Sequence, residues 1–226
     1  GIPLTDSLAP IQSLRHGYPV AGSHAGLPVH LCCTIFGRNQ VTTAGSGQTL
    51  RSRLKAATRA EHDVLDSRLG ALDLADPRQY RTFLEIQYAA RQPVEAWLET
   101  CRADFDLPPA TSPAIIADLA DMGAHSDMTL TTFSAGSDAD PLGAAWVLAG
   151  SSLGNRAMLA GLRKRGEEPE AVRFLSDPAM TSYFSGLRRR IEMPCGDAAP
   201  AIAAAKATFA HFQLICDAML SPRLAA

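Results

Sequence analysis

Long apolar segments are missing from this chain of 226 residues. No run approaches the roughly 20 apolar residues that a helix needs to cross a bilayer, so we expect no membrane-spanning helix. The N-terminal part also lacks a basic segment followed by an apolar one, so we expect no secretory leader. Hydrophobic residues nevertheless make up 46% of the chain, which is enough for a sizeable core.

An excess of positive charge is missing too, because the formal net charge is -2 at pH 7. Proteins that bind nucleic acid usually carry a basic face, and membrane-surface proteins often carry a basic patch. We therefore predict neither a nucleic-acid partner nor a membrane partner. The chain also has no glycine-rich fingerprint for a flavin or nicotinamide dinucleotide.

The five cysteines form no Cys-x-x-Cys pair; they are Cys32, Cys33, Cys101, Cys195 and Cys216. An odd and scattered set is typical of free thiols in a reducing compartment. We therefore expect a cytoplasmic protein without a disulfide framework.

The composition changes near residue 48. Residues 1–48 hold only three charged side chains and show no helical period, so we expect a poorly ordered extension. Residues 49–221 show apolar residues at three- and four-residue spacing, which predicts an all-α, multi-helix bundle. Several helices should start at a cap residue followed by proline: Asp76-Pro77, Ser112-Pro113, Asp140-Pro141 and Asp177-Pro178. The expected helices span 50–69, 77–104, 113–122, 141–165, 169–175, 178–192 and 199–220.

The first expected helix carries a histidine, His62, two turns after Lys55. Seven residues bring the direction of a helical side chain back to within about 20°, with about 10 Å of axis between the two positions. A neutral imidazole can bind iron axially, and a lysine ammonium can pair with a carboxylate on the same ligand. By periodicity alone, a solvated or hydrogen-bonded histidine remains the commoner interpretation.

The segment Leu54-Lys55-Ala-Ala-Thr58-Arg-Ala-Glu-His62 resembles the proximal-helix motif of heme oxygenases, Leu-Lys-x-Ala-Thr-x-x-x-His. The resemblance implies that His62 binds heme iron and that Lys55 lies beside a heme propionate. The resemblance covers about residues 50–220. The motifs are most similar to those of the bacterial heme oxygenases that make biliverdin for phytochromes.

Two glycines, Gly150 and Gly154, fall inside the expected helix 141–165 and share one face. Each interior glycine costs about 1 kcal/mol relative to alanine, which suggests that a helix or a flat ligand approaches the backbone closely. The segment resembles the distal helix of heme oxygenases, which implies a catalytic role for both glycines. Ser151 then stands where mammalian-type enzymes carry an aspartate that organises water, and we include it among the cofactor-binding residues.

Arginines gather at the end of the expected helix 178–192, at Arg188, Arg189 and Arg190. They favour the negative end of their own helix dipole, which is the simplest interpretation. The resemblance implies a second role, because heme oxygenases keep an arginine near the propionates and Arg188 matches it best.

The resemblance implies a heme oxygenase that uses O2 to cleave heme to biliverdin, carbon monoxide and ferrous iron. Heme would be both substrate and prosthetic group, and electrons would come from a ferredoxin, a flavodoxin or a reductase. A non-catalytic heme carrier or sensor on the same fold is the main alternative. A di-iron oxidase, a thiaminase-like hydrolase and a purely interacting bundle remain further alternatives, although the chain has no Glu-x-x-His pair for a di-iron centre.

Overall fold

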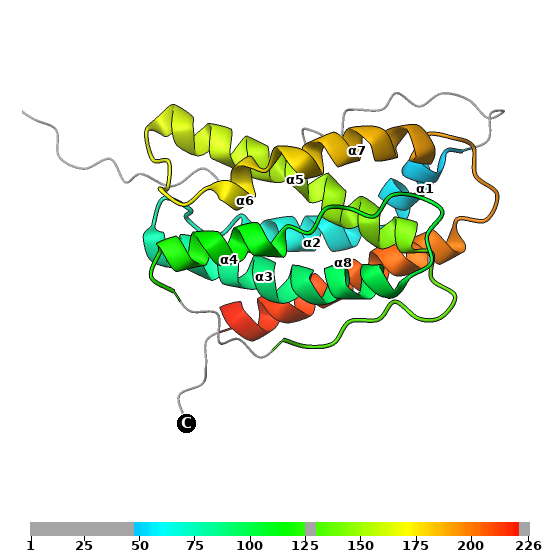
Figure 1. The fold of residues 1–226 in the computed structure, drawn as a ribbon, viewed down its shortest axis with the longest axis horizontal. Coiled ribbons are helices and arrows are strands. Elements are labelled where there is room, and N and C mark those ends of the chain that lie inside the picture. The colour runs from blue at the N-terminus through cyan, green and yellow to red at the C-terminus, as the bar shows by residue number, and fades with distance from the viewer. Residues whose placement is uncertain (1–47, 125–129, 222–226) are drawn as a thin grey trace, which may run out of the picture.

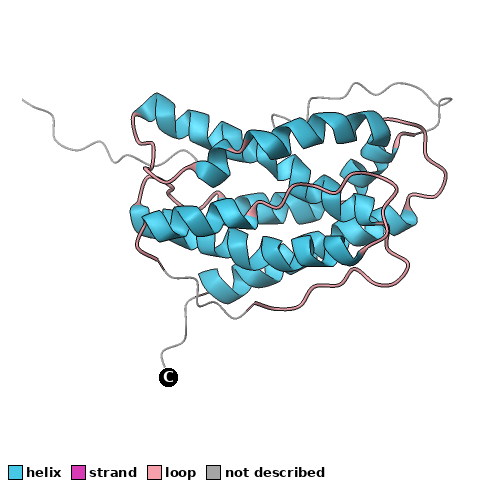
Figure 2. Cartoon of the chain, in the orientation of Figure 1, coloured by secondary structure: helices cyan, strands magenta, loops and turns pink. Residues whose placement is uncertain are grey.

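A computed structural model describes residues 48–124 and 130–221. Over these residues the chain is helical and contains no strand, which confirms the predicted all-α class (Figure 2). Residues 1–47, with nearly all of the expected extension and with Cys32 and Cys33, lie outside the described residues. In chain order the helices are α1 (Leu50–Ala57), α2 (Arg59–Leu69), α3 (Pro77–Thr100), α4 (Ser112–Asp121), α5 (Pro141–Arg165), α6 (Arg173–Ser176), α7 (Pro178–Ile191) and α8 (Ala199–Leu220).

The helix α8 is the shared neighbour of α1, α2, α3 and α5 (Figure 1). The larger core cluster joins side chains of α1, α2, α3, α5, α7 and α8. A smaller cluster joins the first half of α3 to α4, the second half of α5 and α6. The helices α3 and α5 therefore run through both clusters. No helix in the described part of the chain is both long and apolar enough to cross a bilayer.

All three predicted Asp-Pro helix starts are confirmed. The carboxylates of Asp76, Asp140 and Asp177 each accept a hydrogen bond from the backbone N–H two residues later, at 2.8–2.9 Å. The Ser112-Pro113 start is wrong in detail, because the cap position is Thr111 and no side chain of the helix itself caps it. The Glu95 carboxylate of α3 accepts from the backbone N–H groups of Thr111 and Ser112 instead, at 2.9 and 3.3 Å. A carboxylate from a neighbouring helix thus replaces the expected serine cap.

Other helix boundaries also differ from the predicted ones. The helix expected over 77–104 ends at Thr100, where the backbone of Cys101 turns extended. The short helix expected over 169–175 begins at Arg173, because the buried Asp118 carboxylate of α4 accepts from the backbone N–H groups of Arg173 and Phe174 at 3.0 and 2.9 Å. A long-range contact that periodicity cannot show therefore sets the start of α6.

A glycine near the start of α5 sets how closely α5 and α8 approach each other. A Cβ atom added at Gly143 would lie 1.8 Å from the backbone oxygen of Ala201, far inside contact distance. The backbone N–H of Asp140 also donates to the carbonyl of Pro200 at 3.2 Å, next to this contact. A close backbone approach is thus directly visible at Gly143, which the sequence analysis did not single out.

We predict that Gly143→Ala destabilises the protein, although alanine is the better helix former. Overpacking of a tight core contact typically costs about 1–3 kcal/mol, which outweighs the gain of about 1 kcal/mol in helix propensity. Gly161→Ala is the matched control, because the nearest atom to its added Cβ is a flexible arginine nitrogen at 3.6 Å. Urea unfolding should show a lower midpoint for the first variant and an equal or higher one for the second. A stabilised Gly143→Ala would contradict the backbone contact.

A proline inside α3 leaves one carbonyl without its helical donor. Pro93 has no N–H, so the carbonyl of Ala89 lacks the usual partner four residues later. The ring of His211, on α8, hydrogen bonds to this backbone group. Burial lowers the pKa of His211 and the bond to Ala89 offsets part of that effect, so the ring is neutral near pH 7. The histidine therefore has a structural role in the contact between α8 and α3.

We predict that His211 makes stability fall as the pH drops below about 6.5, the usual pKa of an unfolded histidine. In that range the unfolded chain binds a proton that the folded chain does not, so the free energy of unfolding decreases. His211→Gln keeps an N–H donor but does not titrate, so the change between pH 7.5 and 5.5 should shrink. Urea unfolding of both proteins at the two pH values measures it. Equal changes in the two proteins would rule out this contribution.

Candidate functional site

The two motif residues on the first predicted helix lie on two consecutive helices. The expected helix 50–69 is interrupted at Thr58, where φ is -114° and ψ is 9°. The buried Thr58 hydroxyl donates to the carbonyl of Leu54 at 2.9 Å, a contact that tends to bend helices. The backbone pattern continues across the break, since Thr58 N–H donates to Leu54 and His62 N–H donates to Thr58, both at 3.0 Å. Lys55 and His62 therefore belong to one slightly bent path.

His62 lies over α8, with its side chain only 21% exposed. The imidazole meets the Phe209 ring edge-on, with 6.0 Å between the ring centroids. Its Nδ1 lies 3.4 Å from a carboxylate oxygen of Asp66 and 3.8 Å from one of Asp63. A carboxylate beside Nδ1 favours the tautomer in which Nε2 is the metal-binding nitrogen, an arrangement common behind metal-bound histidines. The chemistry of this histidine thus suits axial ligation of iron.

The apolar residues of α2 do not all lie on its buried side. Val64 is 42% exposed, whereas its neighbour Leu65 is buried.

The two predicted propionate-binding residues lie on helices that contact each other. The Glu192 carboxylate, just after α7, lies 3.0 Å from Arg188 and 3.5 Å from Arg51 of α1. Lys55 lies one turn after Arg51 and therefore shares its side of α1. The start of α1 lies beside the end of α7 in Figure 1. Two arginines thus meet at one carboxylate, with Lys55 on the same side of α1, and the excess of positive charge there suits an anionic ligand edge.

The arginine cluster at the end of α7 does not act as a unit. Arg188 pairs with Glu192, while Arg190 lies 2.5 Å from the Asp104 carboxylate and over the Phe105 ring. Arg190 therefore fixes the loop after α3, and Arg188 is the one that joins the surroundings of α1.

Gly150 and Gly154 are both buried inside α5. The hydroxyls of Ser151 and Ser152, between them, donate to carbonyls three residues earlier, each at 2.7 Å. Such back-bonding serines favour a bend in a helix. Both glycines therefore lie inside α5, with two back-bonding serines between them.

A buried arginine contacts this stretch of α5. Arg91 of α3 is 1% exposed, and its guanidinium donates to the hydroxyl of Ser151 and to Gln87 Oε1, the latter at 3.0 Å. It also lies 5.0 Å from the Phe174 ring centroid. Burial lowers the pKa of Arg91 to about 10, opposed by the carboxylates of Glu95 and Asp177, so the guanidinium remains charged near pH 7.

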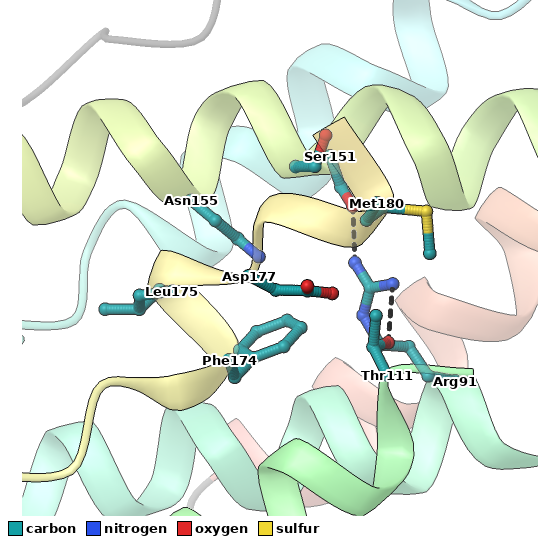
Figure 3. Close-up of a pocket in the computed structure, with 9 residues that line it drawn as sticks. Arg91, Thr111, Ser151, Asn155, Phe174, Leu175, Asp177 and Met180 are labelled. Atoms are coloured by element: carbon teal, nitrogen blue, oxygen red, sulfur yellow. Dashed lines mark hydrogen bonds between the residues drawn. The ribbon is translucent and has the colours of Figure 1, made fainter. Parts of the chain in front are cut away.

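A small cavity of about 10 Å³ adjoins this arginine, which is room for about one water molecule. Figure 3 shows Arg91, Ser151, Asn155 and Asp177 converging on it. The sequence analysis identified Ser151 but missed Arg91 and the cavity. A signal was present, because Gln87, Arg91 and Glu95 form a polar row at four-residue spacing along α3.

Residues 48–124 and 130–221 contain no group of three His, Cys, Asp or Glu side chains arranged to hold a metal ion. Within the same residues, Cys101, Cys195 and Cys216 are free thiols. Heme needs only one histidine from the protein to hold its iron, because the porphyrin nitrogens supply the other ligands.

The sequence matches no family model and no curated protein. A solved structure that the chain resembles is the NO- and CO-bound heme oxygenase from Neisseria meningitidis, with a TM-score of 0.61. The alignment covers 79% of this chain and 95% of that protein, at 21% sequence identity. The chain therefore has the fold of a bacterial heme oxygenase.

Proposed function

We propose that this protein is a heme oxygenase, which cleaves heme to biliverdin, carbon monoxide and ferrous iron with O2 and electrons from another protein. The observation that carries the proposal is the setting of His62, a half-buried imidazole whose Nδ1 faces the Asp66 carboxylate, within a heme oxygenase fold. The Gly150–Gly154 stretch on α5 supports it.

Each candidate residue has a distinct role in this proposal. His62 holds the iron through Nε2, and Asp66 orients the imidazole through Nδ1. Lys55 and Arg188 pair with the propionates. Glu192 already neutralises part of the charge around α1, so the site retains a positive excess suited to two carboxylates.

On the distal side of the proposed site, which is the α5 side opposite His62, the heme would contact the backbone more than side chains. Gly150 and Gly154 let the heme plane approach α5, because neither presents a Cβ atom. Arg91 holds the Ser151 hydroxyl and so fixes the stretch between the glycines. Bound heme would supply both the iron that binds O2 and the macrocycle that is oxidised. The proposed donor is a ferredoxin, a flavodoxin or a reductase, and the free cysteines fit a cytoplasmic enzyme.

A heme carrier or sensor is the second candidate, favoured by Ser151. This residue stands where mammalian-type heme oxygenases have an aspartate, and its hydroxyl already donates to Leu148 and accepts from Arg91. A carrier would bind heme through the same histidine without turning it over.

We predict that hemin titrated into the protein forms a one-to-one complex with a Soret band, and that ascorbate with catalase in air converts it to biliverdin. His62→Ala should lose the axial-ligand spectrum and retain the helical circular dichroism of the wild type. A stable Soret complex with every tested donor, including ferredoxin and flavodoxin with their reductases, would favour the carrier. An unchanged heme spectrum in the variant would reject His62 as the ligand.

We predict that Asp66→Asn lowers hemin affinity roughly 10-fold, the usual scale for removing the charged partner of a metal-bound histidine. It should also lower the frequency of the iron–histidine stretch of the ferrous complex in resonance Raman spectra, since the imidazole becomes less basic. Asp63→Asn is the matched control, because its carboxylate lies farther from Nδ1 and also lies 3.7 Å from Arg59. Equal effects of the two substitutions would show that Asp66 has no special relation to the ligand.

A further inference from the structure

A groove lies on the outer side of α5, between its second half and the start of α7. Its volume is about 380 Å³, within the range of small-molecule sites. The α5 residues along it are Arg156, Leu159, Ala160 and Arg163, and the other wall is formed by Ser176, Pro178, Thr181 and Ser182. At about 100° per residue, this α5 stripe lies roughly opposite the face of Gly150 and Gly154. The groove is therefore separate from the proposed heme site.

The charged groups along the groove are both cationic. Arg163 is held by the Glu168 carboxylate, through hydrogen bonds of 2.8 and 2.7 Å. Arg156 has neither a hydrogen bond nor an ion pair within the part of the chain that the structure describes. The groove thus presents one guanidinium whose charge is not offset by a neighbouring carboxylate.

The start of α7 adds to this preference for an anion. Its N-terminal end carries partial positive charge, and Thr181 and Ser182 of its first two turns line the groove, the Thr181 hydroxyl donating to the carbonyl of Asp177 at 3.5 Å. The acidic cap of α7, Asp177, accepts from its own helix at Ala179 and points toward Arg91 on the inner side (Figure 3). The carboxylate nearest the helix start is therefore turned away from the groove.

The groove also has an apolar part. Ala160 and Pro178 line the groove and are exposed, whereas Leu159 beneath them is buried. Inorganic anions would use only the cationic part of such a surface, whereas an anion with an apolar group would use both.

We propose that this groove binds a small organic oxyanion, with its charged group on Arg156 and Ser182 and its apolar group against Ala160 and Pro178. The inference is independent of heme, because its residues lie on the other side of α5. Binding needs a guanidinium with available donors, an adjacent hydroxyl and an apolar wall, and the groove supplies all three.

The test is a titration of the ¹⁵N-labelled full chain with phenyl phosphate, followed by NMR. Amide signals of residues 178–182 and the Arg156 Nε–H signal should shift in a saturable way. Inorganic phosphate, which lacks the apolar group, and benzyl alcohol, which lacks the charge, should both bind more weakly. Unchanged signals with phenyl phosphate, or equal binding of all three compounds, would overturn the proposal.

Substitutions locate the charge contact. Arg156→Gln should weaken phenyl phosphate binding about 10-fold or more, the scale of a lost hydrogen bond to a charged group. Ser182→Ala should weaken it less. Arg165→Gln is the matched control, because this arginine of the same helix pairs with Glu167 and does not line the groove. Equal affinity of Arg156→Gln and the control would refute the assignment, and circular dichroism shows whether each variant is folded.

Discussion

The arrangement of the helices depends on one buried charge, the guanidinium of Arg91. A charge away from water is tolerated only where hydrogen-bond acceptors surround it, so the acceptors must hold their positions. Arg91 reaches Thr111 before α4 and Ser151 in α5, and its guanidinium carbon lies 5.0 and 5.9 Å from the rings of Phe174 in α6 and Phe212 in α8. One side chain of α3 thus contacts four other segments, and a shift of Thr111 or Ser151 would leave a buried donor unsatisfied.

This constraint links both sides of the proposed heme site. On one side, His62 rests on Phe209 of α8. On the other, the Ser151 hydroxyl between the two glycines is held by Arg91, which also contacts Phe212, three residues after Phe209 on α8. The histidine and the glycine stretch are therefore both positioned relative to the same part of α8. Contacts of both walls with α8 keep the distance between them fixed, which suits a site that must hold a flat, rigid ligand.

Local signals made most of the fold predictable, and long-range contacts account for what was missed. The Asp-Pro starts were predicted because their capping groups lie within two residues. The start of α4 depends on Glu95 from α3, and the close approach at Gly143 depends on α8, so neither could be read from neighbouring residues. The break at Thr58 was missed because one unusual residue leaves the hydrogen-bond spacing intact.

The helix α5 shows that a periodic apolar pattern can predict a buried helix without predicting which residues of that helix form a binding site. One side of it carries Gly143, Gly150 and Gly154 and meets the α8 backbone at Gly143, a second side meets Arg91 through Ser151, and a third lines the outer groove. A helix with contacts on several sides has no single apolar face, so its sequence indicates burial but not which partner each side meets. Because α5 is one continuous helix through all of these contacts, substitutions on one side can alter the others. A substitution in α5 can therefore change heme turnover by altering the stability of the protein. Measuring both stability and hemin affinity on the same variant separates that effect from a direct role of the residue in heme chemistry.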